Sequence, residues 1–215
     1  ELLDSSSGRL NENVICRIIA TLAAKFAKQK SRPQCLTTLG DWALQRRADR
    51  YNRMLEGALH ETRTYELQRD SDLTDIICGT GAIYGYSRKG KLHGEAVPPW
   101  ELYVEIADGR KRTPQRIYRR QLIARRRLIS LYPELRSKIS ESASVGPREA
   151  FDVFGSNDSD VLEVVTGWSL PSDEDADDGR FMRAVAGIVL DDSEWTRPRL
   201  PFAFSRYMIP PDGFW

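Results

Sequence analysis

Apolar residues near the start of the chain recur with the spacing of one side of a helix. The apolar positions are Val14, Ile15, Ile18, Ile19, Leu22 and Phe26. This spacing predicts an amphipathic helix from Asn13 to Lys30, with Asn13 as the N-cap and Pro33 as the residue that stops it. We expect Val14, Ile18, Leu22 and Phe26 to pack in a core shared with the second or third helix.

Two more helices are predicted before residue 80. The second begins near Asp41, whose carboxylate can accept hydrogen bonds from free backbone N–H groups of the first turn. Its apolar side is formed by Trp42, Leu44, Ala48, Tyr51 and Leu55. The third runs from Glu61 to Cys78, and Gly79-Thr80-Gly81 ends it because glycine adopts the left-handed conformation found at helix C-termini.

From Ala82 onward the apolar residues alternate with a period close to two, which predicts strands. A first pair, Ala82–Tyr86 and Leu92–Val97, forms a hairpin around a turn at 88–91. The further strand candidates are Trp100–Ile106, Arg116–Ile123, Val161–Leu170, Phe181–Leu190 and Phe202–Ile209, and the helical candidates are Arg125–Leu131 and Leu135–Ile139. The order predicts an α+β fold, in which N-terminal helices are followed by mostly antiparallel strands.

A serine-rich stretch ending in Gly146-Pro147 is the best internal linker. It predicts a division of the chain into a first part, residues 1–140, with the helices and the first strands, and a strand-rich second part, residues 141–215.

The charges nearly balance over the whole chain but are segregated locally. The net charge is +1, which excludes the uniform basic field of a DNA-coating protein. Nine Arg or Lys residues nevertheless lie between Arg110 and Arg127, and five acids lie in six positions from Asp173 to Asp178. The candidate contact residues are Arg119, Arg120, Arg125, Arg126, Arg127, Asp173, Glu174, Asp175, Asp177 and Asp178. The arginines are expected either to pair with acids of a neighbouring subunit or to bind phosphate.

No motif for catalysis, metal binding or cofactor binding has the spacing that its chemistry requires. Gly79-Thr80-Gly81 lacks the spacing of a nucleotide-binding loop, and the acidic segment has Asp178 and Ala184 where a calcium loop needs Gly and Glu. The three cysteines form no CxxC pair, and neither His60 nor His93 lies beside a nucleophile in a known arrangement. We therefore expect no catalytic residue, no metal, no cofactor and no enzymatic activity. There is also no signal peptide and no long apolar run, so no membrane partner is expected.

Several segments, taken in order, carry a resemblance to a known family. They are Asn13-Val14-Ile15, Ala24-Lys25-Phe26-Ala27-Lys28, Thr37-Thr38-Leu39-Gly40-Asp41-Trp42, Gly79-Thr80-Gly81-Ala82, Val97-Pro98-Pro99-Trp100-Glu101-Leu102-Tyr103-Val104, Leu131-Tyr132-Pro133-Glu134 and Glu194-Trp195-Thr196-Arg197-Pro198. In this order the chain resembles the N-terminal part of the portal proteins, or head-to-tail connectors, of tailed bacteriophages.

The resemblance implies a structural subunit of a dodecameric homo-oligomeric ring at the unique capsid vertex of the virion, assembled in the host cytoplasm. Such a ring forms the channel for genome packaging and ejection and the attachment point of the tail. The chain would be the wing portion, without the stem, clip and crown. The implied partners of the full-length parent are the major capsid protein, neck or adaptor proteins, the terminase and the double-stranded DNA in the channel.

Two other functions remain as alternatives. A non-catalytic nucleic-acid-binding module of replication or repair would use the arginine cluster for phosphate and Trp42, Trp100, Trp168 and Trp195 as stacking groups. A hydrolase or nuclease with dispersed carboxylates is the weaker alternative, because the spacing of the acids does not indicate a metal site.

Overall fold

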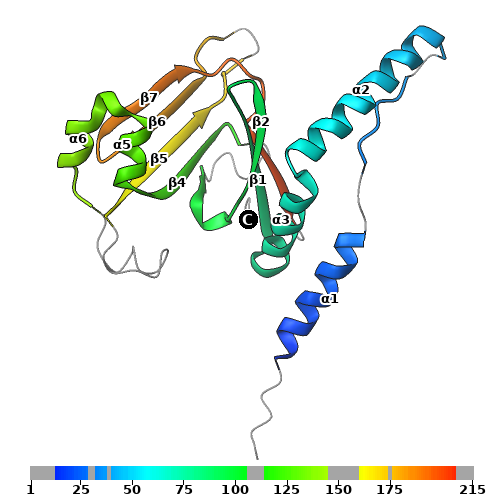
Figure 1. Cartoon of the computed structure of the whole chain (residues 1–215), viewed down its shortest axis with the longest axis horizontal. Helices are drawn as coiled ribbons and strands as arrows, with labels where there is room; N and C mark the ends of the chain where they lie inside the picture. The colour runs from blue at the N-terminus through cyan, green and yellow to red at the C-terminus, as the bar shows by residue number, and fades with distance from the viewer. Residues whose placement is uncertain are drawn as a thin grey trace, which may run out of the picture. The chain divides into compact units, whose positions relative to one another are not determined.

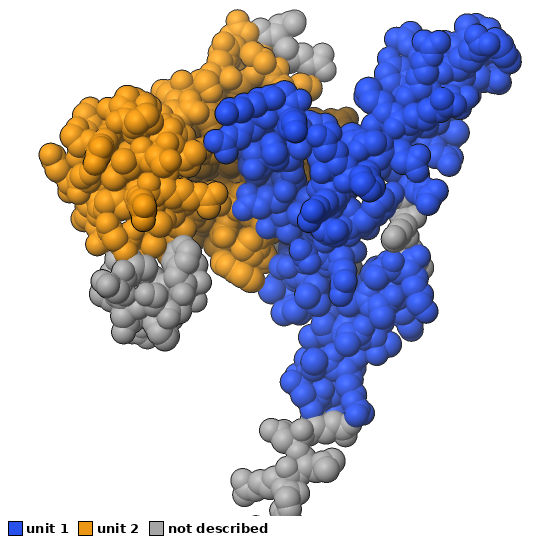
Figure 2. Space-filling model, in the orientation of Figure 1, with its two compact units in different colours: residues 1–96, 204–207 blue, residues 97–203, 208–215 orange. Residues whose placement is uncertain are grey.

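The computed structural model describes residues 13–28, 32–37, 40–105, 114–144, 160–173 and 176–206. The chain divides into two compact units (Figure 2). Unit 1 comprises Glu1–Ala96 with Phe204–Tyr207, and unit 2 comprises Val97–Ala203 with Met208–Trp215. The boundary predicted at 140/141 lies inside unit 2, because the strands that precede and follow the serine-rich stretch pair along their whole length.

Three helices open unit 1: α1 (Val14–Lys28), α2 (Trp42–Glu61) and α3 (Thr64–Cys78) (Figure 1). Both predicted N-caps are confirmed. The side chain of Asn13 accepts a hydrogen bond from the Cys16 N–H at 3.0 Å, and that of Asp41 accepts one from the Ala43 N–H at 3.3 Å. Asparagine and aspartate at these positions satisfy backbone donors that the first turn of a helix leaves free.

The strands of unit 1 follow α3 directly. Gly79 ends α3 in the left-handed conformation, with φ 84°. The chain then forms β1 (Thr80–Arg88) and β2 (Lys91–Val97), and β8 (Phe202–Arg206) completes a three-stranded sheet in the order β2-β1-β8. The predicted hairpin is confirmed: Lys89 and Gly90 form its two-residue turn with φ of 52° and 76°, the positive values that match the twist of the strands.

Unit 2 is built on a five-stranded antiparallel sheet in the order β3-β4-β5-β6-β7. Its strands are β3 (Leu102–Val104), β4 (Arg116–Ala124), β5 (Val161–Ser169), β6 (Arg180–Val185) and β7 (Ile188–Glu194). A 3₁₀ turn at Pro99–Glu101 precedes β3, and α5 (Arg125–Leu131), a 3₁₀ turn (Pro133–Leu135) and α6 (Arg136–Glu141) lie between β4 and β5. Helices followed by antiparallel sheets confirm the predicted α+β class.

The core of unit 2 lies between one face of this sheet and the two short helices (Figure 1). Along β5, Leu162 and Val164 are buried and Val165 is exposed, which is the alternation of a strand with one face covered. Leu128 of α5 and Ile139 of α6 pack with these residues in a single cluster.

Two strand predictions need correction. The segment Phe181–Leu190 is not one strand, because Ala186 and Gly187 form a tight turn with φ of 45° and 80° that separates β6 from β7. The strand expected at Trp100–Ile106 begins only at Leu102, after the 3₁₀ turn that starts at Pro99, and Ile106 is outside the described residues. Proline sets the backbone angle of a helical first turn, which explains the delayed start.

The core predicted for the first helix is wrong at three of its four positions, because only Leu22 is partly buried, on a helix that contacts α3. Val14, Ile18 and Phe26 are 57%, 55% and 41% exposed, and neither α1 nor α2 contains a buried residue. Of the apolar residues that the structure describes as buried, only Ala82 belongs to unit 1, and the others lie in unit 2. Helices α1 and α2 therefore expose many of the side chains that their periodicity predicts to be buried.

Candidate functional site

The predicted arginine cluster is only partly available at the surface. Arg119 is 3% exposed and pairs with Glu101, with Nε 2.9 Å from Oε2. It lies opposite Thr166 in the β4–β5 register, on the buried side of the sheet. A buried guanidinium must keep its carboxylate partner, so Arg119 is part of the interior and not a contact for DNA or a second subunit.

Two further arginines of the cluster also have partners within unit 2. The guanidinium of Arg120 pairs with Glu163, with Nε 2.8 Å from Oε1. Arg125 lies 2.7 Å from a carboxylate oxygen of Asp160. It also donates to the backbone carbonyls of Ile139, Ser140 and Ser142 around the C-terminal end of α6. Positive side chains favour the carbonyl end of a helix, so Arg125 fastens α6 to the sheet.

The two remaining arginines, Arg126 and Arg127, are exposed on α5 and have no partner among the described residues. Of the acidic segment, Asp173, Asp177 and Asp178 are described, and Glu174 and Asp175 lie outside the described residues. Asp178 accepts a hydrogen bond from the Ser172 N–H at 2.7 Å, which holds the pKa of its carboxyl below the ordinary value. This carboxylate closes its own loop.

Within the described ranges, no group of three or more His, Cys, Asp or Glu side chains is arranged to hold a metal ion. None of the helices in that part of the chain has the length and apolar character required to span a membrane.

An exposed apolar stripe on α1 is the first surface that the structure adds. It consists of Val14, Ile15, Ile18 and Phe26, which are 57%, 71%, 55% and 41% exposed. The partly buried residues of α1 are Ile19, Leu22 and Ala23, and α1 contacts α3. Large apolar side chains gathered on one side of a helix mark an interaction surface, whereas single exposed ones do not.

A second surface lies on α2 and is formed by arginines. The partly buried stripe of α2 includes Asn52, Leu55 and Leu59, and the side chain of Asn52 accepts a hydrogen bond from the Cys35 N–H at 2.7 Å. At 3.6 residues per turn, the opposite side of this helix presents one set of exposed basic residues. This set, the arginine face, is Arg46, Arg47, Arg50 and Arg53.

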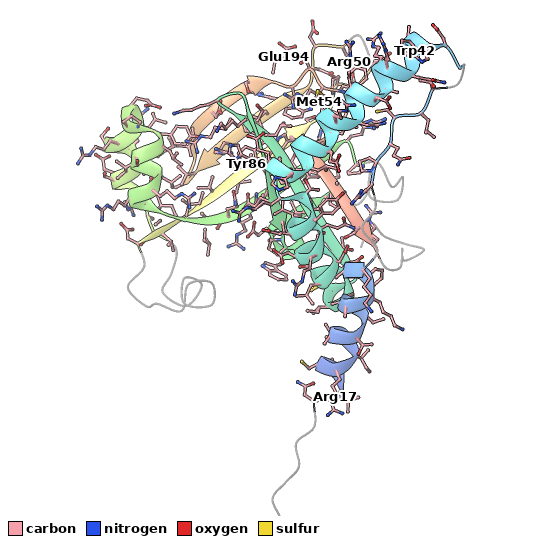
Figure 3. The ribbon with its side chains drawn as sticks, turned by 45° about the vertical axis from the view of Figure 1, so that its right-hand side comes forward. Arg17, Trp42, Arg50, Met54, Tyr86 and Glu194 are labelled. Atoms are coloured by element: carbon pink, nitrogen blue, oxygen red, sulfur yellow. The ribbon has the colours of Figure 1, made fainter. Side chains whose placement is uncertain are left out.

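Aromatic rings flank the arginine face. The guanidinium of Arg46 lies 3.6 Å from the centroid of the Trp42 ring, and that of Arg47 donates to the Tyr51 hydroxyl at 3.3 Å. Figure 3 shows Trp42, Arg50 and Met54 in succession along α2. An open hollow of about 570 Å³ is lined by Trp42, Ala43, Arg46, Arg47, Arg50 and Tyr51.

Like Arg126 and Arg127 of α5, the arginine face lacks carboxylate partners among the described residues, and it gathers four such arginines on one helix. Arg119, Arg120 and Arg180 each pair with an acid. By contrast, no member of the arginine face has an ion pair with any residue that the structure describes. Its four positive charges therefore point to solvent or to a ligand.

The sequence contains a pattern that predicts the arginine face, although the charge distribution predicted a basic surface between Arg110 and Arg127. Arg46, Arg50 and Arg53 are spaced i, i+4, i+7, which puts them on one side of a helix. The acids Asp49 and Glu56 interrupt the basic residues along the chain, so the local net charge is small and the linear pattern hides the face. The arginine face becomes apparent only when the structure shows which side of α2 is partly buried.

Comparison of the sequence with models of known protein families gave no match. A comparison with curated proteins likewise found no significant relative.

Proposed function

We propose that this chain is a structural, non-enzymatic subunit of a homo-oligomeric ring, the portal ring of a tailed bacteriophage, in which it forms part of the wing. The observation that carries the proposal is the apolar stripe on α1, together with the near absence of buried apolar side chains in unit 1. In the ring, the chain would take part in the channel for genome packaging and ejection at the capsid vertex.

The physical argument starts from the stability of α1. A helix of 15 residues is marginal in water by itself, and most of the stability of such a helix in a protein comes from packing of its apolar side. Full burial of one Val, Ile or Phe side chain contributes about 1.5–3 kcal/mol. Burial of the apolar stripe against a second subunit would therefore add stability that the single chain lacks.

A closed ring uses one contact between unlike surfaces, repeated around an axis. Each copy would then place the apolar stripe of α1 against a surface of its neighbour, and every stripe would be covered. The resemblance of the chain to portal proteins supports a ring over a simple dimer, because those proteins assemble as rings with a central channel.

Electron microscopy of the full-length polypeptide that contains this chain, combined with native mass spectrometry, tests the proposal. We expect rings with a central hole and a mass that is a fixed multiple of the subunit mass. A monomer or a symmetric dimer at concentrations where portal rings assemble would contradict the proposal.

A second candidate function, a nucleic-acid contact, is favoured by one specific observation. The observation is the arginine face of α2, and not the cluster between Arg110 and Arg127 that the linear charge pattern indicated.

A further inference from the structure

We propose that the arginine face of α2, formed by Arg46, Arg47, Arg50 and Arg53, binds the phosphate backbone of double-stranded DNA without reading its sequence. The inference does not rest on the proposed ring, because it needs only the folded α2 of one subunit.

The charge and spacing of the four arginines match those of a phosphate backbone. The four guanidinium groups lie within eight residues of one helix, which is about 10 Å of helix axis at 1.5 Å per residue. Duplex DNA carries about one negative charge per 1.7 Å of its axis, so several phosphates lie within the same length. Guanidinium groups match phosphate oxygens with two parallel donors. Arg47 uses part of its guanidinium to donate to the Tyr51 hydroxyl, and none of the four arginines is paired with a carboxylate of a described residue.

Helix stability does not explain the arrangement. Arg46 and Arg50 are spaced i, i+4, and Arg50 and Arg53 are spaced i, i+3, so like charges are neighbours on the helix surface. Such pairs destabilise an isolated helix, and Asp49, which lies three residues after Arg46 and four before Arg53, offsets only part of this repulsion because no ion pair forms. Elsewhere in the chain, as at Arg120 with Glu163, an acid pairs directly with the arginine. An anionic ligand would remove the repulsion on α2.

The aromatic rings offer a single strand less stacking surface than free rings would. Single strands are held by bases that stack on free ring faces. The Trp42 ring is already covered on one side by Arg46 at 3.6 Å, and Tyr51 is held through its hydroxyl by Arg47. The rings therefore fix the direction of two arginines. A convex helix side with ordered guanidinium groups fits the outside or the major groove of a duplex, which admits an α-helix.

Strand β7 of a second copy is a poorer match for the arginine face. The most acidic described strand is β7, with Asp191, Asp192 and Glu194. Asp192 already pairs with Arg180, with Nε 2.8 Å from Oδ1. The remaining acids of this strand are too few to neutralise four arginines, whereas a duplex offers a phosphate for each.

The test measures how binding to a labelled DNA duplex of about 30 base pairs and mixed sequence depends on salt. Binding is followed by fluorescence anisotropy from about 50 to about 200 mM NaCl, a range in which counterion release strongly changes affinity. If all four arginines contact phosphates, log Kd should change with log salt with a slope of about 3.6, from roughly 0.9 per phosphate. The double variant R46Q/R50Q should lower this slope by about 1.8 and weaken binding to all sequences alike.

Three controls separate the proposal from general charge effects. The variant K89Q/K91Q removes the same charge from the exposed β1–β2 turn of the same unit and should leave the slope unchanged. R46K/R50K keeps the charge and should retain most of the slope. Circular dichroism should show equal helix content in all variants, since α2 packs through the opposite side.

Several results would overturn the inference. Equal losses in R46Q/R50Q and K89Q/K91Q would indicate a diffuse charge effect and no site on α2. Binding that single-stranded DNA or polyglutamate competes away as efficiently as the duplex would indicate another class of anionic partner. Loss of self-association in R46Q/R50Q with unchanged DNA binding would make the arginine face a contact between subunits. Native mass spectrometry measures ring assembly independently of DNA binding. If DNA binding fails but rings still form, the inference about α2 is wrong and the proposed ring is unaffected.

Discussion

Neighbouring arginines in this chain have opposite roles, and their surroundings decide which. Arg125 is held by a carboxylate and three carbonyls, whereas Arg126, the next residue, is exposed. The sequence predicted one basic surface from this run because a charge pattern does not show which side chains a fold uses internally. The residues that turn inward, such as Arg119, can be identified only from the strand register.

The first prediction concerns Arg125. Replacement by alanine removes the donors for the carbonyls of Ile139, Ser140 and Ser142 and the partner of Asp160. Because these groups lie at the join between α6 and the sheet, we expect Arg125→Ala to lower the free energy of unfolding by about 2–3 kcal/mol. Urea denaturation measures it.

The matched control for Arg125→Ala is Arg126→Ala, which removes the same side chain from the same helix at an exposed position. Its effect should stay within about 0.5 kcal/mol. Equal effects of the two variants would show that Arg125 does not anchor α6.

The second prediction concerns pH. A hydrogen bond from Arg180 holds the pKa of the Asp192 carboxyl below its ordinary value of 3.8. A pKa that is lowered in the folded state stabilises the fold above the pKa of the unfolded chain, and this stabilisation is lost as the pH falls through the folded value. Titration of the side-chain carboxyl by NMR should show the low midpoint, and Arg180→Gln should move it upward.

The control for Arg180→Gln is Arg197→Gln, which removes an exposed arginine that lies over the Trp195 ring. It should not change the titration midpoint of Asp192. A midpoint that is the same in the wild type and in Arg180→Gln would show that the ion pair between β6 and β7 does not persist in solution.

Most elements of the fold could be predicted from the sequence where local signals agree. The N-caps of α1 and α2, the glycine that ends α3 and the Lys89-Gly90 turn are all local, and all are found. The Ala186-Gly187 turn was missed because it lacks the Asn or Asp that usually marks a two-residue hairpin turn. Periodicity also cannot tell whether the apolar side of a helix is covered within the chain, which is why the stripe on α1 was assigned to a core.

The third prediction concerns α1. Since Ile18 is 55% exposed, Ile18→Asp should change the stability of the unassembled chain by no more than about 0.5–1 kcal/mol, from helix propensity. If the apolar stripe packs against a neighbouring subunit, the same change puts an unpaired carboxylate in that contact and removes a buried apolar side chain. The concentration needed for assembly should then rise by at least about tenfold. Sedimentation velocity measures it.

Ala24→Asp is the control, because it adds the same charge to an exposed position on the other side of α1. It should leave assembly unchanged. An Ile18→Asp variant that assembles like the wild type would remove the apolar stripe from the subunit contact, and one that unfolds without assembly would restore the original prediction of an internal core.

The uneven distribution of the core is the main feature of the whole molecule. Among the described residues, the buried apolar side chains gather in the five-stranded sheet and its two short helices, and the exceptions are Ala82 of β1 and Val97 at the end of β2. The sequence does not reveal this, since 40% of its residues are hydrophobic and those of α1 and α2 follow the pattern of packed helices. Under the proposed ring, a neighbouring subunit covers those of α1.

The last prediction follows from this imbalance and is measured by hydrogen exchange with mass spectrometry. In the unassembled chain, amides of β4 and β5 should exchange only through global unfolding, because these strands are paired on both sides and cover the core. Amides of α1 and α2 should exchange much faster, since helices without buried residues open locally at low cost in free energy.

On assembly, α1 should gain protection, because the neighbouring subunit covers its apolar stripe, whereas β4 and β5 should change little. On addition of duplex DNA to the unassembled chain, protection should rise in α2 and not in α1. Protection that rises equally in both helices under either condition would show that α1 and α2 respond as one element, and the separate assignments of the apolar stripe and the arginine face would then fail together.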